Sequence, residues 1–141
     1  MRAVIDTGVF ISYLIKGRSV HVWTIHLWLT KQFTLVMSPA IIAELVDVSA
    51  RPKIANQIEE ASRLTLLRRL RQQAIWTPGA LDTAGATPDP KDDMLVSAAL
   101  ETEADFIVTW DKALLNMGAY DNVRFVDPES FVNIVQRQGS E

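Results

Sequence analysis

Five acidic side chains stand where they could do chemistry together. They are Asp6, Glu44, Asp92, Asp93 and Asp111. Each lies at or inside an apolar run, where a buried strand ends or a helix packs against a core. Carboxylates that converge on one place repel one another, so their pKa values rise or a cation is bound. Oxygen ligands of this kind favour a hard ion, Mg²⁺ or Mn²⁺, and such ions commonly serve phosphoryl chemistry.

Each acid taken singly has a simpler explanation. Asp92 and Asp93 could cap a helix and complement its dipole, and Asp111 could do the same for the short helix after it. Glu44 could be a solvated helix residue. Asp6 is the exception, because a carboxylate at the buried end of a central strand is costly unless a partner compensates it.

The elements that must position these acids alternate between strands and helices. We expect strands at residues 2–6, 34–37, 74–76, 106–109 and 124–126. We expect helices at about 10–15, 20–31, 39–48, 54–73 (as one piece or two), 92–103, 112–116 and 127–138. The alternation predicts a three-layer α/β/α fold with a central, mainly parallel sheet. Ligands bind such sheets beyond the carboxyl ends of the strands, where Asp6 and Asp111 would lie.

Helical spacing also predicts which side chains face inward. Residues 39–48 begin after Ser38, a helix cap, and carry Ile42, Leu45 and Val46 inward. Residues 54–73 carry an inward stripe of leucines. The stripe consists of Leu64, Leu67 and either Leu70 or Leu66. Trp23 and Trp28 lie on a helix that is apolar over much of its circumference, which indicates deep burial or contact with another chain.

Composition narrows the classes of protein. The chain has 141 residues, 48% of them hydrophobic and 22% charged, which fits one globular domain over residues 1–141 and argues against disorder. It has no cysteine, which excludes disulfides and thiolate metal sites. The net charge of −3 means that any nucleic-acid role rests on a local site rather than on bulk attraction. No apolar run approaches the ~20 residues of a membrane span, and no signal peptide is evident, so we expect a cytoplasmic protein.

Four segments, in order along the chain, resemble the motifs of PIN-domain nucleases. They are Val4–Phe10, Ser38-Pro39 with Ile42–Leu45, Asp89–Asp93 with Leu95–Ala99, and Ile107–Asp111 with Leu114-Leu115. The Asp-Pro-Lys-Asp-Asp form is most similar to a branch described as toxins of toxin–antitoxin systems, relatives of the VapC toxins. The resemblance implies a PIN-like fold and a divalent-metal-dependent endoribonuclease. It also implies a cognate antitoxin protein and a homodimer.

The resemblance further implies roles for individual residues. Asp6, Glu44, Asp93 and Asp111 would be the catalytic metal ligands for Mg²⁺ or Mn²⁺. Asp93 is preferred to Asp92 because the family's third acid directly precedes the small and apolar residues of its helix. Asp92 then becomes a helix cap or a hydrogen-bond acceptor behind the ligands. Thr109 matches the hydroxyl residue before the last acid and would orient that acid or a metal-bound water.

One position departs from the family pattern. The usual asparagine after Asp-Thr is Gly8 here, so side-chain hydrogen bonds that could fix the neighbouring loop are lost. Glycine tolerates a positive φ, so the turn itself can survive. The departure bears on the geometry around Asp6 and leaves all four carboxylates in place.

Basic residues near the expected strand ends are candidates for binding RNA phosphates. They are Lys16, Arg18, Lys91 and Lys112. Each could equally be a solvated surface cation. A denser basic stretch could extend the RNA path, although the solvent face of an amphipathic helix is the slightly preferred interpretation. It consists of Arg63, Arg68, Arg69 and Arg71.

Two alternatives to a nuclease stay open. The first is a doubly wound phosphatase or receiver domain, which also places an aspartate after its first strand. A phosphatase of the haloacid-dehalogenase type would need a second aspartate where Gly8 stands, and the acids of a receiver domain are distributed differently. The second is a non-catalytic PIN-like domain that binds RNA or protein, which the loss of the asparagine keeps in view.

Overall fold

The computed structural model describes residues 1–15 and 22–139. Its centre is a six-stranded sheet with the strand order β3-β2-β1-β4-β6-β5. The strands are β1 (Arg2–Ile5), β2 (Thr34–Met37), β3 (Ile75–Trp76), β4 (Phe106–Val108), β5 (Ala119–Tyr120) and β6 (Val123–Val126). Every neighbouring pair is parallel except β5 and β6. The predicted mainly parallel sheet is confirmed, and the short antiparallel edge strand β5 is an element that the sequence pattern missed.

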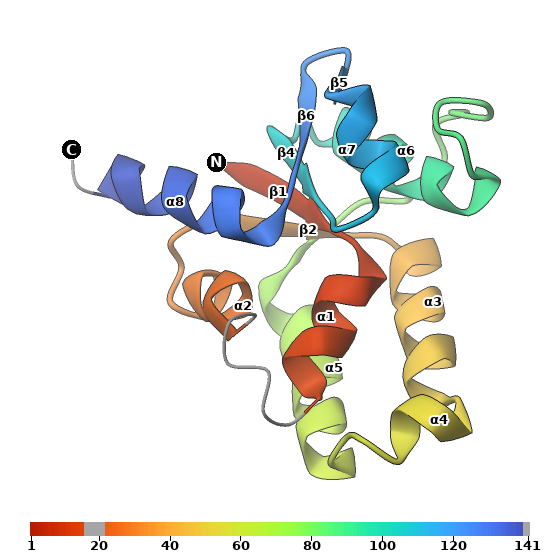
Figure 1. Cartoon of the computed structure of the whole chain (residues 1–141), viewed down its shortest axis with the longest axis vertical. Coiled ribbons are helices and arrows are strands. Elements are labelled where there is room, and N and C mark those ends of the chain that lie inside the picture. The colour runs from red at the N-terminus through yellow and green to blue at the C-terminus, as the bar shows by residue number, and fades with distance from the viewer. Residues whose placement is uncertain (16–21, 140–141) are drawn as a thin grey trace.

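Helices cover both faces of this sheet in the described part of the chain. They are α1 (Thr7–Leu14), α2 (Val22–Leu29), α3 (Pro39–Ala50), α4 (Pro52–Ala55), α5 (Glu60–Gln73), the 3-10 turn η2 (Pro90–Asp92), α6 (Asp93–Glu101), α7 (Lys112–Met117) and α8 (Pro128–Gly139). Figure 1 shows α6 and α7 on one side of the sheet and α1, α2 and α5 on the other. The three-layer α/β/α prediction is therefore confirmed. None of the described helices is long and apolar enough to cross a membrane.

The boundaries of α3 show how local sequence sets these elements. Ser38 has extended backbone angles, and its side chain accepts a hydrogen bond from the Ile41 amide at 3.3 Å. Pro39 occupies the first helical position, where its missing N–H costs nothing. The helix ends before Pro52, because the residue before a proline is pushed out of the helical region. α3 therefore begins at the carboxyl end of β2, with its first turns beside the sheet edge.

Two predicted core positions are wrong. Leu64 is 52% exposed and Val46 is 36% exposed. The buried stripe of α5 consists of Leu66, Leu67 and Leu70. At 3.6 residues per turn this stripe continues toward the helix start at position 63, which places Leu64 about 100° away. Arg63 therefore takes the place on the inner face that the pattern gave to a leucine.

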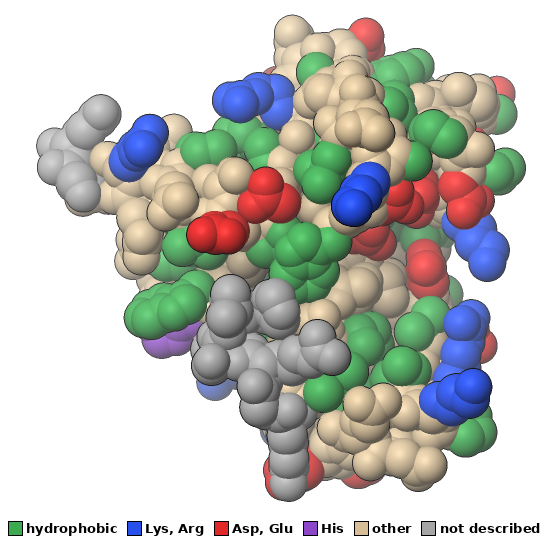
Figure 2. Space-filling view, in the orientation of Figure 1, with side chains coloured by type: hydrophobic (Ala, Val, Ile, Leu, Met, Phe, Trp, Pro, Cys, Tyr) green, Lys and Arg blue, Asp and Glu red, His purple; other side chains and the backbone are tan. Residues whose placement is uncertain are grey.

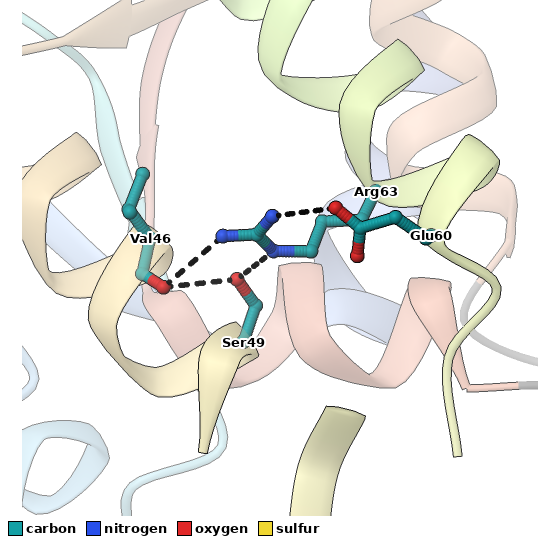
Figure 3. A network of polar contacts seen from close by, with 4 residues as sticks. All are labelled: Val46, Ser49, Glu60 and Arg63. Atoms are coloured by element: carbon teal, nitrogen blue, oxygen red, sulfur yellow. Dashed lines mark hydrogen bonds and ion pairs between the residues drawn. The ribbon is translucent and has the colours of Figure 1, made fainter. Parts of the chain in front are cut away.

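Arg63 ties α5 to α3 (Figure 3). Its Nε donates to Ser49 Oγ at 2.7 Å, one terminal nitrogen donates to the Val46 carbonyl at 3.4 Å, and the other pairs with Glu60 at 3.1 Å. Its guanidinium is thus held between two helices by three polar contacts. The rest of the basic stretch is exposed on α5, as the solvent-face interpretation expects. These residues are Arg68, Arg69 and Arg71.

The two tryptophans of α2 have different environments. Trp28 is 1% exposed and belongs to the core, whereas Trp23 is 54% exposed and stands edge-on to His26. Burial therefore explains Trp28 alone. Trp23 remains an apolar side chain on the surface.

Candidate active site

The carboxyl ends of β1 and β4 bring Asp6 and Asp111 to one edge of the sheet. The Asp6 amide donates to the Val108 carbonyl at 2.9 Å, which continues the parallel pairing by one residue. Thr109, whose side chain is fully buried, donates from Oγ1 to Asp6 Oδ2 at 2.8 Å. Thr109 Oγ1 also accepts a hydrogen bond from the Asp111 amide at 3.0 Å. Thr109 therefore fixes the Asp6 carboxylate and the backbone of Asp111 at the same time.

Asp111 also caps the helix that follows it. Its Oδ1 accepts hydrogen bonds from the Ala113 amide at 2.8 Å and the Leu114 amide at 3.4 Å. The capping explanation therefore holds for this acid, and it does not exclude a second role. The charge of Asp111 raises the pKa of both Asp6 and Asp92, so it acts on the same site.

Glu44 approaches this edge from α3. Burial raises its pKa, and the negative charge of Asp6 raises it further. The positive charges of Lys91 and Arg51 oppose this rise. Burial likewise raises the pKa of Asp6, against the hydrogen bond from Thr109. The carboxylates of Asp6 and Glu44, which come from different elements, therefore lie in the same partly buried region.

Asp92 is the acid most affected by this cluster. Burial and then the charges of Asp6, Asp111, Asp89 and Glu44 raise its pKa to about 6. All four of these charged neighbours are acids, so each of them raises the pKa of Asp92. The structure therefore brings Asp92 together with Asp6, Glu44 and Asp111 at the carboxyl edge of the sheet.

Asp93 has a different environment from the one its motif position suggested. Its Oδ1 accepts the Thr87 amide at 2.9 Å and the Thr87 hydroxyl at 2.7 Å, and its Oδ2 accepts the Gly85 amide at 3.0 Å. The Thr87 hydroxyl is the largest cause of its lowered pKa, and the neighbouring acids contribute nothing to that shift. Asp93 is bound to the preceding loop, while Asp92 faces the acidic cluster.

The start of η2 explains why these two adjacent acids have different environments. Asp89 caps the turn, because its Oδ1 accepts the Lys91 amide at 3.0 Å. Helical backbone therefore begins at Pro90, and Asp92 already lies inside the turn with φ −86° and ψ −12°. Asp92 occupies the cap position of α6 as expected, but its side chain makes no capping hydrogen bond. The signal for this was the Asp-Pro pair, a common cap and first-turn combination.

The expected phosphate contacts divide into described and undescribed residues. Lys91 and Lys112 are exposed beside the acids, whereas Lys16 and Arg18 lie outside the described residues. Arg51 is a cation that sequence reasoning missed. It lowers the pKa of Glu44 and forms an exposed ion pair with Asp47 at 3.0 Å. In Figure 2 acidic side chains gather where β1 and β4 end near the start of α3, with basic side chains on both sides.

Gly8 lies in the first turn of α1 rather than in a strained loop. Its φ is not positive, and a Cβ added there would meet nothing within 4 Å. The conformational freedom of glycine is therefore not needed at this position. A Cβ is therefore tolerated at the position where the family pattern carries asparagine.

The donors at this edge suit a hard divalent cation. Carboxylate oxygens come from β1, α3, η2 and the end of β4, and burial and mutual repulsion raise three of their pKa values. The buried hydroxyl of Thr7, next to Asp6, has no hydrogen-bond partner among the described residues. Within those residues no three acidic or histidine side chains are close enough to enclose an ion. Mg²⁺ is usually held by only one or two carboxylates and several waters, so this spacing fits it.

Comparison with known proteins decides the family. A family model of the PIN domain matches residues 2–113. This chain belongs to the PIN-domain family. PIN domains are generally nucleases that use divalent metal ions. The match also decides against the phosphatase and receiver alternatives.

Two solved structures share the PIN fold of this chain. VapBC2 from Rickettsia felis, bound to a DNA fragment from its promoter, matches with a TM-score of 0.60 and 16% identity over 89% of this chain and 97% of that one. FitAcB from Neisseria gonorrhoeae matches with a TM-score of 0.53 and 16% identity over 90% of this chain and 98% of that one. At this identity the likeness concerns the fold. No curated protein matches the sequence significantly.

Proposed function

We propose that this PIN domain is the toxin of a toxin–antitoxin pair and acts as a divalent-metal-dependent endoribonuclease. The observation that carries the proposal is the clustering of four acids, with the pKa of Asp92 raised to about 6 by burial and by the other acids. A cluster of carboxylates at a functional sheet edge favours cation binding. Family membership supplies the reaction class.

The acids that would hold the metal in this proposal, one or two directly and the others through its bound waters, are Asp6, Glu44, Asp92 and Asp111. Asp92 replaces Asp93 as the third acid, because Asp93 is engaged by Thr87 and Gly85. A bound Mg²⁺ or Mn²⁺ would neutralise phosphate charge and lower the pKa of a water that attacks the phosphodiester. Thr109 holds Asp6 through its hydroxyl, so that the carboxylate keeps one orientation.

Basic residues around the acids bind the RNA backbone in this proposal. Lys91 and Arg51 lie close enough to Glu44 to affect its pKa, and Lys112 directly follows Asp111. Their charges would hold phosphates at the edge of the acidic cluster, which alone would repel RNA. Lys16 and Arg18 stay candidates for the same role. A local basic rim is consistent with a chain whose net charge is −3.

The proposed partners are a cognate antitoxin and a second copy of this chain, in the cytoplasm. VapBC2 and FitAcB, which share the fold, support the antitoxin. Exposed apolar side chains, among them Trp23 and Leu64, provide surface for such contacts. Co-purification of the chain with the product of the neighbouring reading frame would test the antitoxin.

Cleavage of RNA by the purified chain tests the activity. We expect cleavage of at least one of a varied set of RNAs with Mn²⁺ or Mg²⁺, and none with a chelator. Asp92→Asn should remove cleavage, whereas Asp121→Asn should not. Asp121 is a matched control, because it lies in the turn before β6, at the opposite end of the sheet. If the parent binds Mn²⁺ yet cleaves nothing, the non-catalytic binding domain is the better function.

A further inference from the structure

One face of α6 fastens the long segment that leads to the acidic site. Asp93, Ser97 and Glu101 are spaced four residues apart, so they form one stripe along the helix. All three bind residues 77–87, an irregular segment with two glycines and three alanines that would otherwise be expected to vary in conformation. In Figure 1 this segment is drawn in green between α5 and α6. The stripe gives an irregular segment a fixed path.

Glu101 holds the first half of the segment. Its carboxylate accepts the Thr77 hydroxyl at 2.6 Å and the amides of Gly79, Ala80 and Leu81 at 2.7, 2.7 and 2.9 Å. Gly79 has a φ of 68°, a left-handed conformation that glycine adopts readily. These contacts stay within residues 77–81.

Asp93 holds the second half in a similar way. Its carboxylate accepts the amides of Gly85 and Thr87, and Gly85 again has a left-handed φ of 82°. We call Glu101 and Asp93 the two anchors of the segment. Between them, Ser97 Oγ donates to the Leu81 carbonyl at 2.9 Å, and Thr83 Oγ1 donates to the Asp93 carbonyl at 2.8 Å.

The two anchors differ in what they reach. Thr87 Oγ1 lies 2.7 Å from Asp93 Oδ1 and 2.6 Å from the Asp89 carbonyl oxygen, and its single proton is donated to one of these acceptors at a time. Asp89 caps η2, the turn that carries Lys91 and Asp92. A continuous chain of polar contacts thus runs from the Asp93 carboxylate through Thr87 to the backbone that presents Asp92. Glu101 has no such connection among its hydrogen bonds.

We propose that Asp93 is a positioning residue, which acts through Thr87 to hold the turn η2 so that Asp92 faces Asp6 and Glu44. The inference rests on the proposed function, because Asp92 is a metal ligand only in that proposal. Asp93 itself touches neither metal nor substrate. Its removal would loosen η2 and weaken metal binding while leaving all four ligands in the chain. Partners that orient metal ligands typically contribute about 10–100-fold to metal affinity.

Binding of Mn²⁺ alone, measured by calorimetry without RNA, tests the proposal. The variants are Asp93→Ala, Thr87→Val, the double variant, and Glu101→Ala as the matched anchor. We expect Asp93→Ala to weaken Mn²⁺ binding about tenfold and Thr87→Val about threefold, as the loss of one donor among three. Because the two residues act in series, Thr87→Val should add nothing in the Asp93→Ala background. Glu101→Ala should lower the melting temperature without changing Mn²⁺ affinity.

Three outcomes would overturn the inference. Unchanged Mn²⁺ affinity in Asp93→Ala would make Asp93 a purely structural anchor. Abolished Mn²⁺ binding in an Asp93→Ala variant that still folds would make Asp93 a ligand. Equal losses in Glu101→Ala and Asp93→Ala would indicate general loosening of the segment. If Asp93→Ala does not fold, the Mn²⁺ affinities of Thr87→Val and Glu101→Ala test the inference. A loss in Thr87→Val alone supports it, and equal affinities overturn it. Failure of the parent to bind Mn²⁺ would instead refute the proposed function, and with it the inference.

Discussion

Asp92 and Asp93 are adjacent in the chain, and their carboxylates stand in opposite environments. Asp92 is surrounded by the charges of other acids, and burial and these charges raise its pKa to about 6. Asp93 receives three hydrogen bonds from Thr87 and Gly85, and its pKa is lowered. The same chemical group thus faces other acids on one side of a helix start and accepts three hydrogen bonds on the other.

The same contrast separates two regions of the molecule. At the carboxyl edge of the sheet, few donors face many acids, so negative charge accumulates there. Along the α6 stripe, donors from residues 77–87 match the acceptors of Asp93 and Glu101. A carboxylate with matched donors serves structure, whereas a cluster without them favours a cation. The supply of donors, rather than position in a motif, distinguishes the two roles.

The test with the largest expected effect removes the charge of each aspartate in turn. At saturating Mn²⁺ we expect Asp92→Asn to lower RNA turnover at least about 100-fold, beyond the 10–100-fold typical of groups behind metal ligands. Asp93→Asn should retain most of its turnover under the same conditions, because excess metal compensates a weakened site. Turnover is measured by single-turnover cleavage, with thermal melts to confirm folding. Loss in Asp93→Asn and retention in Asp92→Asn would restore Asp93 as the third ligand.

A smaller effect is expected from the donor that links two site acids. Thr109→Val keeps the shape of the side chain and removes the hydroxyl that donates to Asp6 and accepts from Asp111. We expect a loss of Mn²⁺ affinity of about tenfold, since the Asp6 carboxylate is no longer oriented. Calorimetry measures the affinity, and Thr65→Val on the exposed surface of α5 is the control. Unchanged affinity would mean that Asp6 is held by its backbone alone.

The fold could be predicted largely because its signals are local. Buried apolar runs such as Ala3–Ile5 and Phe106–Val108 predict central strands, and Ser38 with Pro39 predicts a helix start. β5 was missed because two residues, one exposed and one half-buried, give no periodicity. Leu64 was placed inward because a leucine stripe at either of two phases fits the sequence. Only the packing of Arg63 onto Ser49 selects the phase.

The residue types of the site could be predicted from the sequence. Which of the two adjacent aspartates joins the acidic cluster was harder to predict. Asp6 and Asp111 follow from parallel strands that end together. The choice between Asp92 and Asp93 depends on Thr87 and Gly85, whose amides reach Asp93 through a loop with no regular structure. The contribution of Arg51 depends on the position of α3 relative to Glu44, a tertiary property.

The free energy of unfolding should depend on pH in a way that reflects the acidic cluster around Asp92. Folded Asp92 keeps its proton up to about pH 6, whereas the unfolded chain loses it near 3.8. Between these values the folded state binds more protons, so the contribution of Asp92 to the free energy of unfolding falls as pH rises. Asp92→Asn removes this loss. In metal-free buffer at pH 7 we expect the variant to be more stable than the parent by about 1–2 kcal/mol, after allowance for solvent screening.

Urea unfolding of both proteins with a chelator, from pH 4 to pH 7.5, measures this difference. The advantage of Asp92→Asn should grow from pH 4 to about pH 6 and stay constant above. Asp93→Asn should show the opposite sign at pH 7, because its lowered pKa means that the charged form stabilises the fold. A constant difference across the whole range would show that Asp92 does not titrate in the folded protein in this window.

The smallest expected effect concerns Gly8, which borders the acidic region without adding charge to it. Glycine in a helix is less stable than alanine by about 0.5–1 kcal/mol, and a Cβ at this position meets no atom within 4 Å. Gly8→Ala should therefore raise the free energy of unfolding by about that amount and leave Mn²⁺ affinity unchanged. Gly8→Asn should fold equally well, since the same space is open to its side chain. Urea unfolding and calorimetry on the two variants measure both quantities. A loss of Mn²⁺ binding in Gly8→Ala would show that the open backbone at Gly8 belongs to the metal site, and the boundary between the two regions would then have to include α1.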